Sequence, residues 1–253
     1  MNIYSILRSI KKSPKLGRVR KYLNLLYYDP DTVIINYKNF DTISVDGCQF
    51  YVNDQIDSVQ RVKGNPWFEG VRPSDTVLDI GANIGAITIP LAKVARKVYA
   101  VEPLFADILC ANVQLNRLKN VEILPVAIGL EESATIEFSS RKARAPMLLF
   151  GSLIETIAKE NQGKGIDFIK IDGEGCEWDI EPEQLSGIRE IRIEFHLRRG
   201  HKKEDNTKLN RWMDWFYNEG YDVHTSWGKP PLCVPFTACL VLRATKRESH
   251  ENK

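Results

Sequence analysis

From about residue 76 onward, short apolar segments alternate with segments of helical pattern. The apolar segments are TVLDI, KVYAVE, VEILPVAI, DFIKID and EIRIEF. Helical patterns such as IGAITIPLAKVA and LFADILCANVQLNRL lie between them. Apolar strands joined by helices are typical of a parallel sheet covered on both faces. The chain is therefore predicted to form an α/β domain with a doubly wound, mostly parallel sheet.

The end of the chain departs from this alternation. A helical segment, NTKLNRWMDWFYNEG, leads into YDVHTSWG, and TACLVLRAT follows across a loop with three prolines. Two strands joined without a helix pair antiparallel. An antiparallel last strand is therefore predicted to close the sheet.

The first 64 residues are predicted to be a small appendage, and residues 65–253 the main domain. Residues 1–28 contain seven basic residues and no acid, and their pattern is helical. Residues 31–56 are rich in β-branched and aromatic residues, with turn signals at Lys38-Asn39 and Asp46-Gly47. This pattern predicts a β-hairpin or a small meander.

Composition indicates an ordinary soluble protein, with 43% hydrophobic and 27% charged residues and a net charge of +2. The five cysteines form no CxxC pair, which favours reduced thiols over a disulfide framework or a zinc site. The N-terminus does not fit a signal peptide, and no apolar run approaches the ~18 residues of a membrane span. We expect a cytoplasmic protein.

The segment VLDIGANIG contains the first candidate binding residues. An acid, Asp79, precedes two glycines, Gly81 and Gly85. The dinucleotide fingerprint has a third glycine and places a pyrophosphate on the helix N-terminus. An acid here would repel a pyrophosphate but suits a cationic ligand such as S-adenosylmethionine. The predicted cofactor loop is Asp79, Gly81, Ala82, Asn83 and Gly85.

The next two strand ends extend the predicted cofactor site. Glu102 ends KVYAVE, where a carboxylate can accept the two ribose hydroxyls of an adenosine. Pro103 and Leu104 follow it, and the small apolar Val126 and Ala127 after the third strand suit an adenine face. Binding of NAD or a flavin is the alternative.

Ionisable residues also end the fourth and fifth strands. Asp172, Glu174 and Glu177 follow DFIKI, while Glu194 and His196 share one face of the next strand. His196 is the predicted general base near neutral pH. The carboxylates are expected to orient it, to bind a polyhydroxyl substrate or to hold a divalent cation. Helix capping is the alternative role, above all for Glu177.

In this order, VLDIGANIGAITIPLAK, VYAVEP, ANVQLN, VAIG, IDFIKIDGEGCEWDI and IEFH resemble the FkbM family of class I S-adenosylmethionine-dependent methyltransferases. The resemblance covers roughly residues 65–200. It implies a seven-stranded class I (Rossmann-like) fold and O-methylation of a hydroxyl. Its cofactor motif falls on Asp79, Gly81, Asn83, Gly85 and Glu102, and its fourth-strand motif on Asp172, Glu174 and Glu177. Gly173 departs from the family, in which valine is common.

The acceptor is expected to be a hydroxyl of a small molecule or a glycan. The alternative is an RNA methyltransferase acting on ribose 2′-O or on tRNA. Three basic patches, at 1–21, 141–144 and 198–203, motivate this alternative because they could contact a phosphate backbone.

Overall fold

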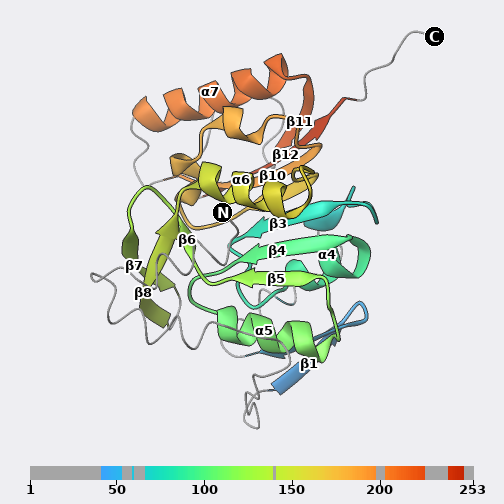
Figure 1. The fold of residues 1–253 in the computed structure, drawn as a ribbon. Coiled ribbons are helices and arrows are strands. Elements are labelled where there is room, and N and C mark those ends of the chain that lie inside the picture. Colours follow the sequence, from blue (N-terminus) through green and yellow to red (C-terminus); the bar gives the residue numbers. More distant parts are fainter. Residues whose placement is uncertain are drawn as a thin grey trace, which may run out of the picture.

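The protein, described here from a computed structural model, is built on a central seven-stranded sheet of order β11-β12-β10-β9-β3-β4-β5 (Figure 1). The structure describes residues 41–52, 59, 66–138, 141–197, 203–225 and 239–247. The strands are β3 (Thr76–Ile80), β4 (Lys97–Val101), β5 (Val121–Leu124), β9 (Phe168–Ile171), β10 (Glu190–His196), β11 (Tyr221–Thr225) and β12 (Cys239–Lys246).

Strand β12 is antiparallel to both of its neighbours, β10 and β11. The other pairings in this sheet are parallel. The predicted mixed sheet with an antiparallel last strand is therefore confirmed, as are the seven strands. The order reverses between β3 and β9, because β4 follows β3 on one side and β9 lies on the other.

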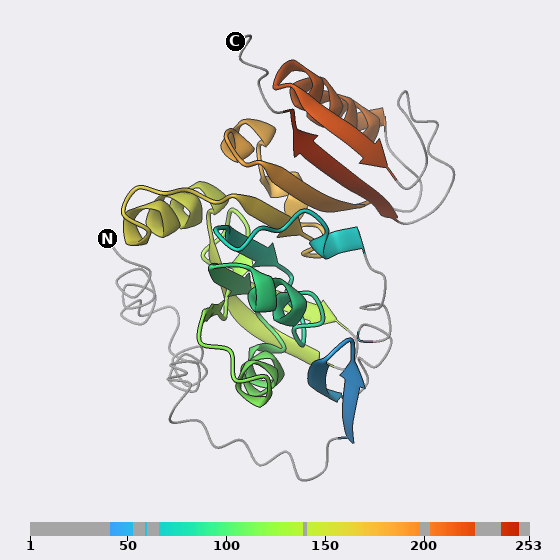
Figure 2. The same cartoon turned by 90° about the vertical axis from the view of Figure 1, so that its right-hand side faces the viewer.

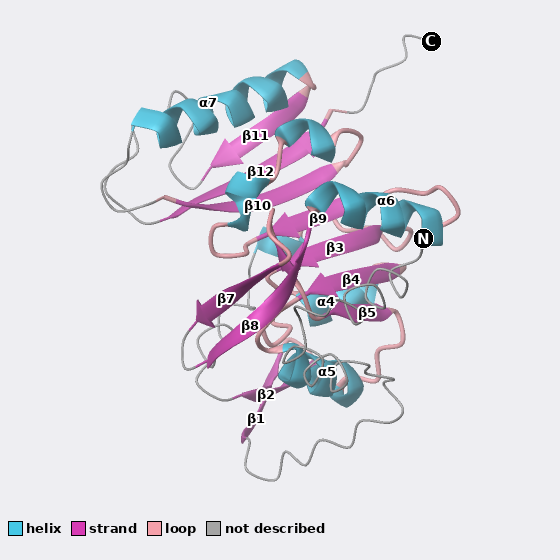
Figure 3. Cartoon of the chain, turned by 60° about the vertical axis from the view of Figure 1, so that its left-hand side comes forward, coloured by secondary structure: helices cyan, strands magenta, loops and turns pink. Residues whose placement is uncertain are grey.

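Helices cover both faces of the sheet. Helices α6 (Phe150–Glu160) and α7 (Lys203–Asn218) lie on one face (Figure 3), together with the 3₁₀ helices η3 (Cys176–Asp179) and η4 (Pro182–Leu185). Helices α4 (Thr88–Val94) and α5 (Ala106–Leu115) pack against the other face. Alternate residues of one strand therefore enter different cores, as Leu78 and Val77 do.

Between residues 176 and 185 the chain forms two 3₁₀ helices, η3 and η4, and not one continuous helix. The interruption falls at Glu181, whose backbone is extended (φ −85°, ψ 133°). Proline disfavours the helical conformation in the residue before it, so Pro182 accounts for the break.

Strands β1 (Asp41–Val45) and β2 (Cys48–Val52) form the predicted hairpin. Asp46 and Gly47 have φ of 48° and 73°, as a two-residue type I′ turn requires. The hairpin lies against α5 (Figure 2), where the Tyr51 N–H donates to Asn112 Oδ1 at 2.7 Å. Phe50 is buried in the same core as residues of α4 and α5. The predicted turn at Lys38-Asn39 and the basic segment 1–28 lie outside the described residues.

A second, three-stranded sheet has the order β6-β8-β7. Its strands are β6 (Ala127–Ile128), β7 (Ser133–Phe138) and β8 (Arg141–Leu148). Strand β8 was not predicted, because its basic residues and Pro146 are unusual in a strand.

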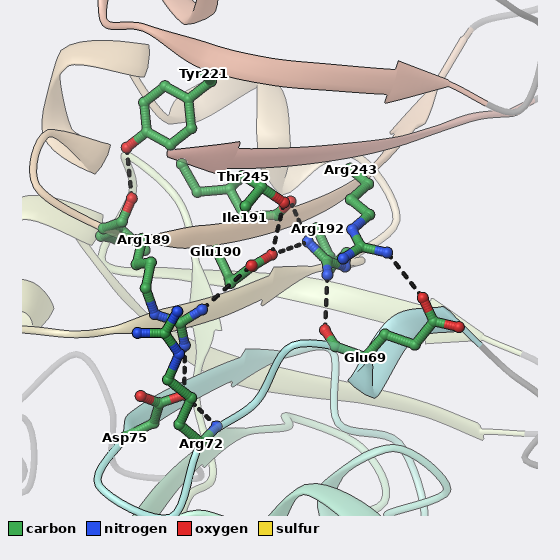
Figure 4. Close-up of polar contacts among 11 residues, drawn as sticks. Glu69, Arg72, Asp75, Arg189, Glu190, Ile191, Arg192, Tyr221, Arg243 and Thr245 are labelled. Carbon is green, nitrogen blue, oxygen red and sulfur yellow. Dashed lines mark hydrogen bonds and ion pairs between the residues drawn. The ribbon is translucent and has the colours of Figure 1, made fainter. Parts of the chain in front are cut away.

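A buried ionic network fixes the turn η2 (Pro66–Phe68) to the main sheet (Figure 4). Arg192, from the middle of β10, donates to the Glu69 carbonyl oxygen and to Glu190 Oε2, both at 2.8 Å. Arg189 donates to Glu190 Oε1 at 3.2 Å. This network positions Trp67 of η2, which lines the cavity described below.

Candidate active site

Gly81 directly follows β3, beside the residues that follow its parallel neighbour β9. Its φ is +74°, and a Cβ built on it would lie 1.7 Å from the Asp172 carbonyl oxygen. A side chain is therefore excluded by the neighbouring backbone. Gly85 has a different role, because a Cβ there would lie 2.8 Å from Leu109 Cδ1 of α5. Both glycines serve close packing within the protein.

We expect Gly81→Ala to be far more destabilising than Gly220→Ala. Gly220 has nearly the same φ, +75°, but open space around its missing Cβ. Gly220→Ala should therefore cost only the left-handed strain, about 1–2 kcal/mol. Gly81→Ala should cost about 1–3 kcal/mol more, the cost of overpacking. Urea denaturation of both variants measures the difference, and equal losses would contradict the close approach of the Gly81 and Asp172 backbones.

Asp79 and Lys170 lie opposite each other on these two neighbouring strands and form a buried ion pair. Lys170 Nζ is 3.2 Å from Asp79 Oδ1 and 3.5 Å from Asp172 Oδ2, and it donates to the Gly81 carbonyl oxygen at 2.7 Å. Asp79 Oδ2 accepts a hydrogen bond from Thr88 at 2.6 Å. Burial by itself lowers the pKa of Lys170, but the carboxylates of Asp79 and Asp172 outweigh it and raise that pKa. Lys170 is therefore protonated, and it lies where the strand order reverses between β3 and β9.

Glu102 organises the loop after β4. Its Oε1 accepts the N–H groups of Leu104 and Phe105 at 2.6 and 2.9 Å, and its Oε2 accepts that of Asn83 at 2.8 Å. Burial raises the pKa of Glu102, while these backbone donors act in the opposite direction. Oε2 has one protein donor and so retains a lone pair for a ligand hydroxyl.

The turn after β9 brings several acids to the end of β10. Glu174 has φ +56°, an unusual conformation for a residue with a side chain and one often found at functional sites. Glu177 is buried; its Oε2 accepts the Gly175 N–H at 2.9 Å and its Oε1 accepts the His196 N–H at 2.7 Å. Glu177 therefore joins the turn to β10, in addition to its place at the start of η3.

His196 lies among carboxylates. Its Nδ1 is 3.2 Å from Glu177 Oε1, and its Nε2 is 3.3, 3.8 and 3.9 Å from Glu174 Oε2, Asp172 Oδ1 and Glu194 Oε1. Burial by itself lowers the pKa of His196, but Glu177, Glu174 and Asp172 raise it to about 9. A pKa above neutrality favours the protonated ring, so the general-base role predicted for His196 would require the ring to lose this proton first.

A cavity of about 270 Å³ opens at the carboxyl ends of β3, β4, β9 and β10. Ligands of open α/β sheets bind at such an edge, next to the point where the strand order reverses. Its wall has an apolar part and an acidic part. The apolar part comes from Trp67, Ile87, Phe105, Ile136 and Phe138, and the acidic part from Glu102, Glu137, Asp172, Glu174 and Glu194.

The structure brings most of the predicted site residues together at this cavity. Those that line it are Gly81, Ala82, Asn83, Glu102, Pro103, Leu104, Asp172, Glu174 and Glu194. Asp79, Gly85, Val126 and Ala127 are not part of the lining, and His196 lies behind the carboxylates. The apolar wall that we assigned to Val126 and Ala127 comes instead from Phe105 and from β7.

Sequence reasoning missed Lys170, which lines the cavity. The signal was a lysine in the middle of an otherwise apolar strand, FIKI. A lysine is almost never fully buried without a partner. That rule alone would have predicted a buried acid opposite Lys170.

The described basic patch, 141–144, does not present a row of free cations. Arg141 donates to Asp107 Oδ1 at 2.6 Å, and Lys142 pairs with Glu137. Arg144 donates to Ser133 Oγ at 2.9 Å. The patch at 1–21 lies outside the described residues, as does nearly all of 198–203.

The strand order, the single antiparallel strand and the position of the cavity define a class I methyltransferase fold. The family model described as a methyltransferase FkbM domain matches residues 79–223, and the chain belongs to this family.

Shorter matches connect the chain to RNA methyltransferases. It is 43% identical over 56 residues to the probable ribosomal RNA small subunit methyltransferase A of Methanosphaera stadtmanae, covering 21% of each chain. It is 41% identical over 69 residues to the 23S rRNA (uracil(1939)-C(5))-methyltransferase RlmD of Yersinia enterocolitica, covering 27% of this chain and 15% of that protein. The chain thus spans about a fifth or less of the length of these relatives.

Among solved structures, TYW2 of M. jannaschii in complex with AdoMet aligns with 84% of this chain and 88% of its own, at 18% identity and a TM-score of 0.46.

Within the described residues, no helix combines the length and apolar character needed to cross a membrane.

Proposed function

We propose that this protein transfers a methyl group from S-adenosylmethionine to a hydroxyl of a small polyhydroxylated molecule or a glycan. The observation that carries the proposal is the acidic half of the cavity, where Asp172, Glu174 and Glu194 converge beside the glycine loop. Family membership supports the methyl transfer itself.

The chemistry of the cavity fits the cofactor. Glu102 retains a lone pair for the ribose hydroxyls, and Phe105, Ile136 and Phe138 provide an apolar wall for the adenine. The acidic part suits the ammonium and sulfonium charges. When bound, the cofactor supplies an electrophilic methyl group.

The protein's own residues would then bind and orient the acceptor. Carboxylates accept hydrogen bonds from hydroxyl groups, so Asp172, Glu174 and Glu194 suit a polyol. One of them also takes the hydroxyl proton as the oxygen attacks the methyl group. His196 acts through them as a positioning residue, because it lies behind the cavity lining.

Charge favours this acceptor over RNA. Five carboxylates line the cavity. Lys170 also lines it, but this lysine is already paired with Asp79 and Asp172. A phosphate backbone is poorly matched to that lining. RNA remains the alternative because the curated relatives act on ribosomal RNA by name.

The cysteines described by the structure carry free thiols, which supports a reducing compartment such as the cytoplasm.

We expect Glu102→Gln to weaken S-adenosylmethionine binding by about 1.5–3 kcal/mol, the contribution of a hydrogen bond to a charged group. Glu131→Gln is the matched control, because Glu131 is exposed and outside the cavity. Isothermal titration calorimetry measures both. Binding of NADH in place of S-adenosylmethionine would overturn the cofactor assignment.

The acceptor class is tested by transfer of a radiolabelled methyl group from S-adenosylmethionine to fractionated cell extract. We expect label in the polar small-molecule or glycan fraction, unchanged by RNase. Label that disappears after RNase treatment would overturn the acceptor class in favour of RNA.

A further inference from the structure

The carboxylate–histidine cluster is defined here as Asp172, Glu174, Glu194 and His196. Three carboxylate oxygens surround one nitrogen, His196 Nε2, at 3.3, 3.8 and 3.9 Å. Charge-assisted N–H···O hydrogen bonds are shorter, about 2.7–2.9 Å. The carboxylates therefore approach the ring without forming good hydrogen bonds to it.

One of these separations matches the edge of a metal coordination shell. Ligand atoms that each lie about 2.0–2.2 Å from a metal ion are about 2.8–3.6 Å from one another in octahedral or tetrahedral geometry. The Glu174–His196 distance, 3.3 Å, falls inside this range, and the other two are slightly longer. The donor atoms of Asp172, Glu174 and His196 all lie within 4.8 Å of one another.

Glu177 supplies an independent feature of metal sites. Metal-binding histidines usually donate their second ring N–H to a carboxylate, which fixes the ring orientation. Glu177 is buried, and its Oε1 lies 3.2 Å from His196 Nδ1. The same oxygen accepts the His196 backbone N–H, so the ring is held with Nε2 toward the other acids.

Charge balance also points to a cation. Four carboxylates lie close to the ring nitrogens of His196, at 3.2, 3.3, 3.8 and 3.9 Å. Lys170 is 3.5 Å from Asp172 but is shared with Asp79, which is fully buried. The cluster therefore retains an excess of negative charge beside the cavity.

We propose that Asp172, Glu174 and His196 bind a divalent first-row transition-metal ion at the acceptor side of the cavity. The combination of imidazole with carboxylates favours zinc, manganese, iron or cobalt over magnesium and calcium. Glu194 and Cys239 form a second donor set that shares His196 and lies next to the first.

The role of the ion in catalysis rests on the proposed function, whereas its binding does not. Three protein ligands leave coordination positions open. An acceptor hydroxyl that occupies one of them would lose its proton more readily, because the metal would stabilise the negative charge that develops on its oxygen. Glu194, which lines the cavity and is not one of the three ligands, would take this proton. The oxygen forms its new bond to the methyl carbon as the bond between that carbon and the sulfonium sulfur breaks.

The test is calorimetric titration of untagged, chelator-treated full-length protein with Zn²⁺, repeated with Mg²⁺. We expect one Zn²⁺ ion per chain to bind at this site, and Mg²⁺ much more weakly. His196→Ala and Glu174→Gln should each lower the Zn²⁺ affinity at least about 100-fold, since even an outer carboxylate contributes about 10–100-fold. Glu174 is largely exposed, so Glu174→Gln keeps the test valid if His196→Ala fails to fold.

His224→Ala is the matched control, because His224 is exposed on β11 and should leave Zn²⁺ affinity unchanged. Equal Zn²⁺ affinity in wild type, His196→Ala and Glu174→Gln would overturn the proposal, as would an absence of stoichiometric binding. S-adenosylmethionine binding is measured in the same samples. Loss of metal binding with the cofactor still bound leaves the proposed function standing, so the two proposals can fail separately.

Discussion

Replacing Lys170 with methionine is expected to lower the free energy of unfolding by about 3–5 kcal/mol, the typical cost of breaking a buried ion pair. The substitution keeps the length of the side chain but leaves the carboxylate of Asp79 buried without its cation. Asp79 is fully buried, and Thr88 would be its remaining hydrogen-bond partner. Urea denaturation of the purified variant measures the loss.

Two further variants identify the cause of this loss. The double variant Asp79→Leu with Lys170→Met should be more stable than Lys170→Met alone, because no isolated buried charge remains. Lys142→Met is the surface control: Lys142 pairs with Glu137 and both are exposed, so it should cost no more than about 1 kcal/mol. If the effect of Lys170→Met were as small as that of Lys142→Met, the charge of Lys170 would not be needed to stabilise the buried carboxylate of Asp79.

Asp172→Asn is expected to lower the methyl-transfer rate by about 10²-fold or more, within the range of a placed proton acceptor or acceptor-orienting group. Asp172 lines the cavity and lies between Lys170 and His196, at 3.5 and 3.8 Å. The amide keeps the shape of the side chain but removes its charge. Affinity for S-adenosylmethionine should change less than about threefold, because the main cofactor contacts are assigned to the glycine loop and Glu102.

Single-turnover kinetics with the acceptor found in the labelling experiment measures the rate, and calorimetry measures cofactor affinity. Asp214→Asn is the control, since Asp214 is exposed on α7 and outside the cavity. Wild-type turnover in Asp172→Asn would exclude this carboxylate from the reaction, and a rate loss matched by an equal loss of cofactor affinity would reassign it to the cofactor site.

Many residues of the site could be predicted from the positions at which the strands end. The carboxyl ends of parallel strands meet at one edge, so residues at the ends of β3, β4, β9 and β10 were predicted to converge. Gly81, Glu102, Asp172 and Glu194 do converge there. The period of two along β10 also placed Glu194 and His196 on one face, and their side chains lie 3.9 Å apart.

The roles within the site could not be predicted in the same way. Asp79 was expected to face a ligand but is paired with Lys170, because β3 and β9 are neighbours in register, with Asp79 opposite Lys170. The protonation of His196 depends on Glu177, which reaches it from η3. Neither relation is visible from spacing along the chain.

The class of fold, the antiparallel last strand, the hairpin turn and the edge of the sheet that holds the site could all be predicted from the sequence alone. These depend on local periodicity and on turn residues, which act over a few positions. Three features could be seen only in the folded protein: the acid that neutralises Lys170, the carboxylate that holds the imidazole of His196, and the backbone that leaves no room for a side chain at Gly81. These depend on contacts between residues far apart in the chain, such as Gly81 and Asp172, whose distance is set by strand order and register.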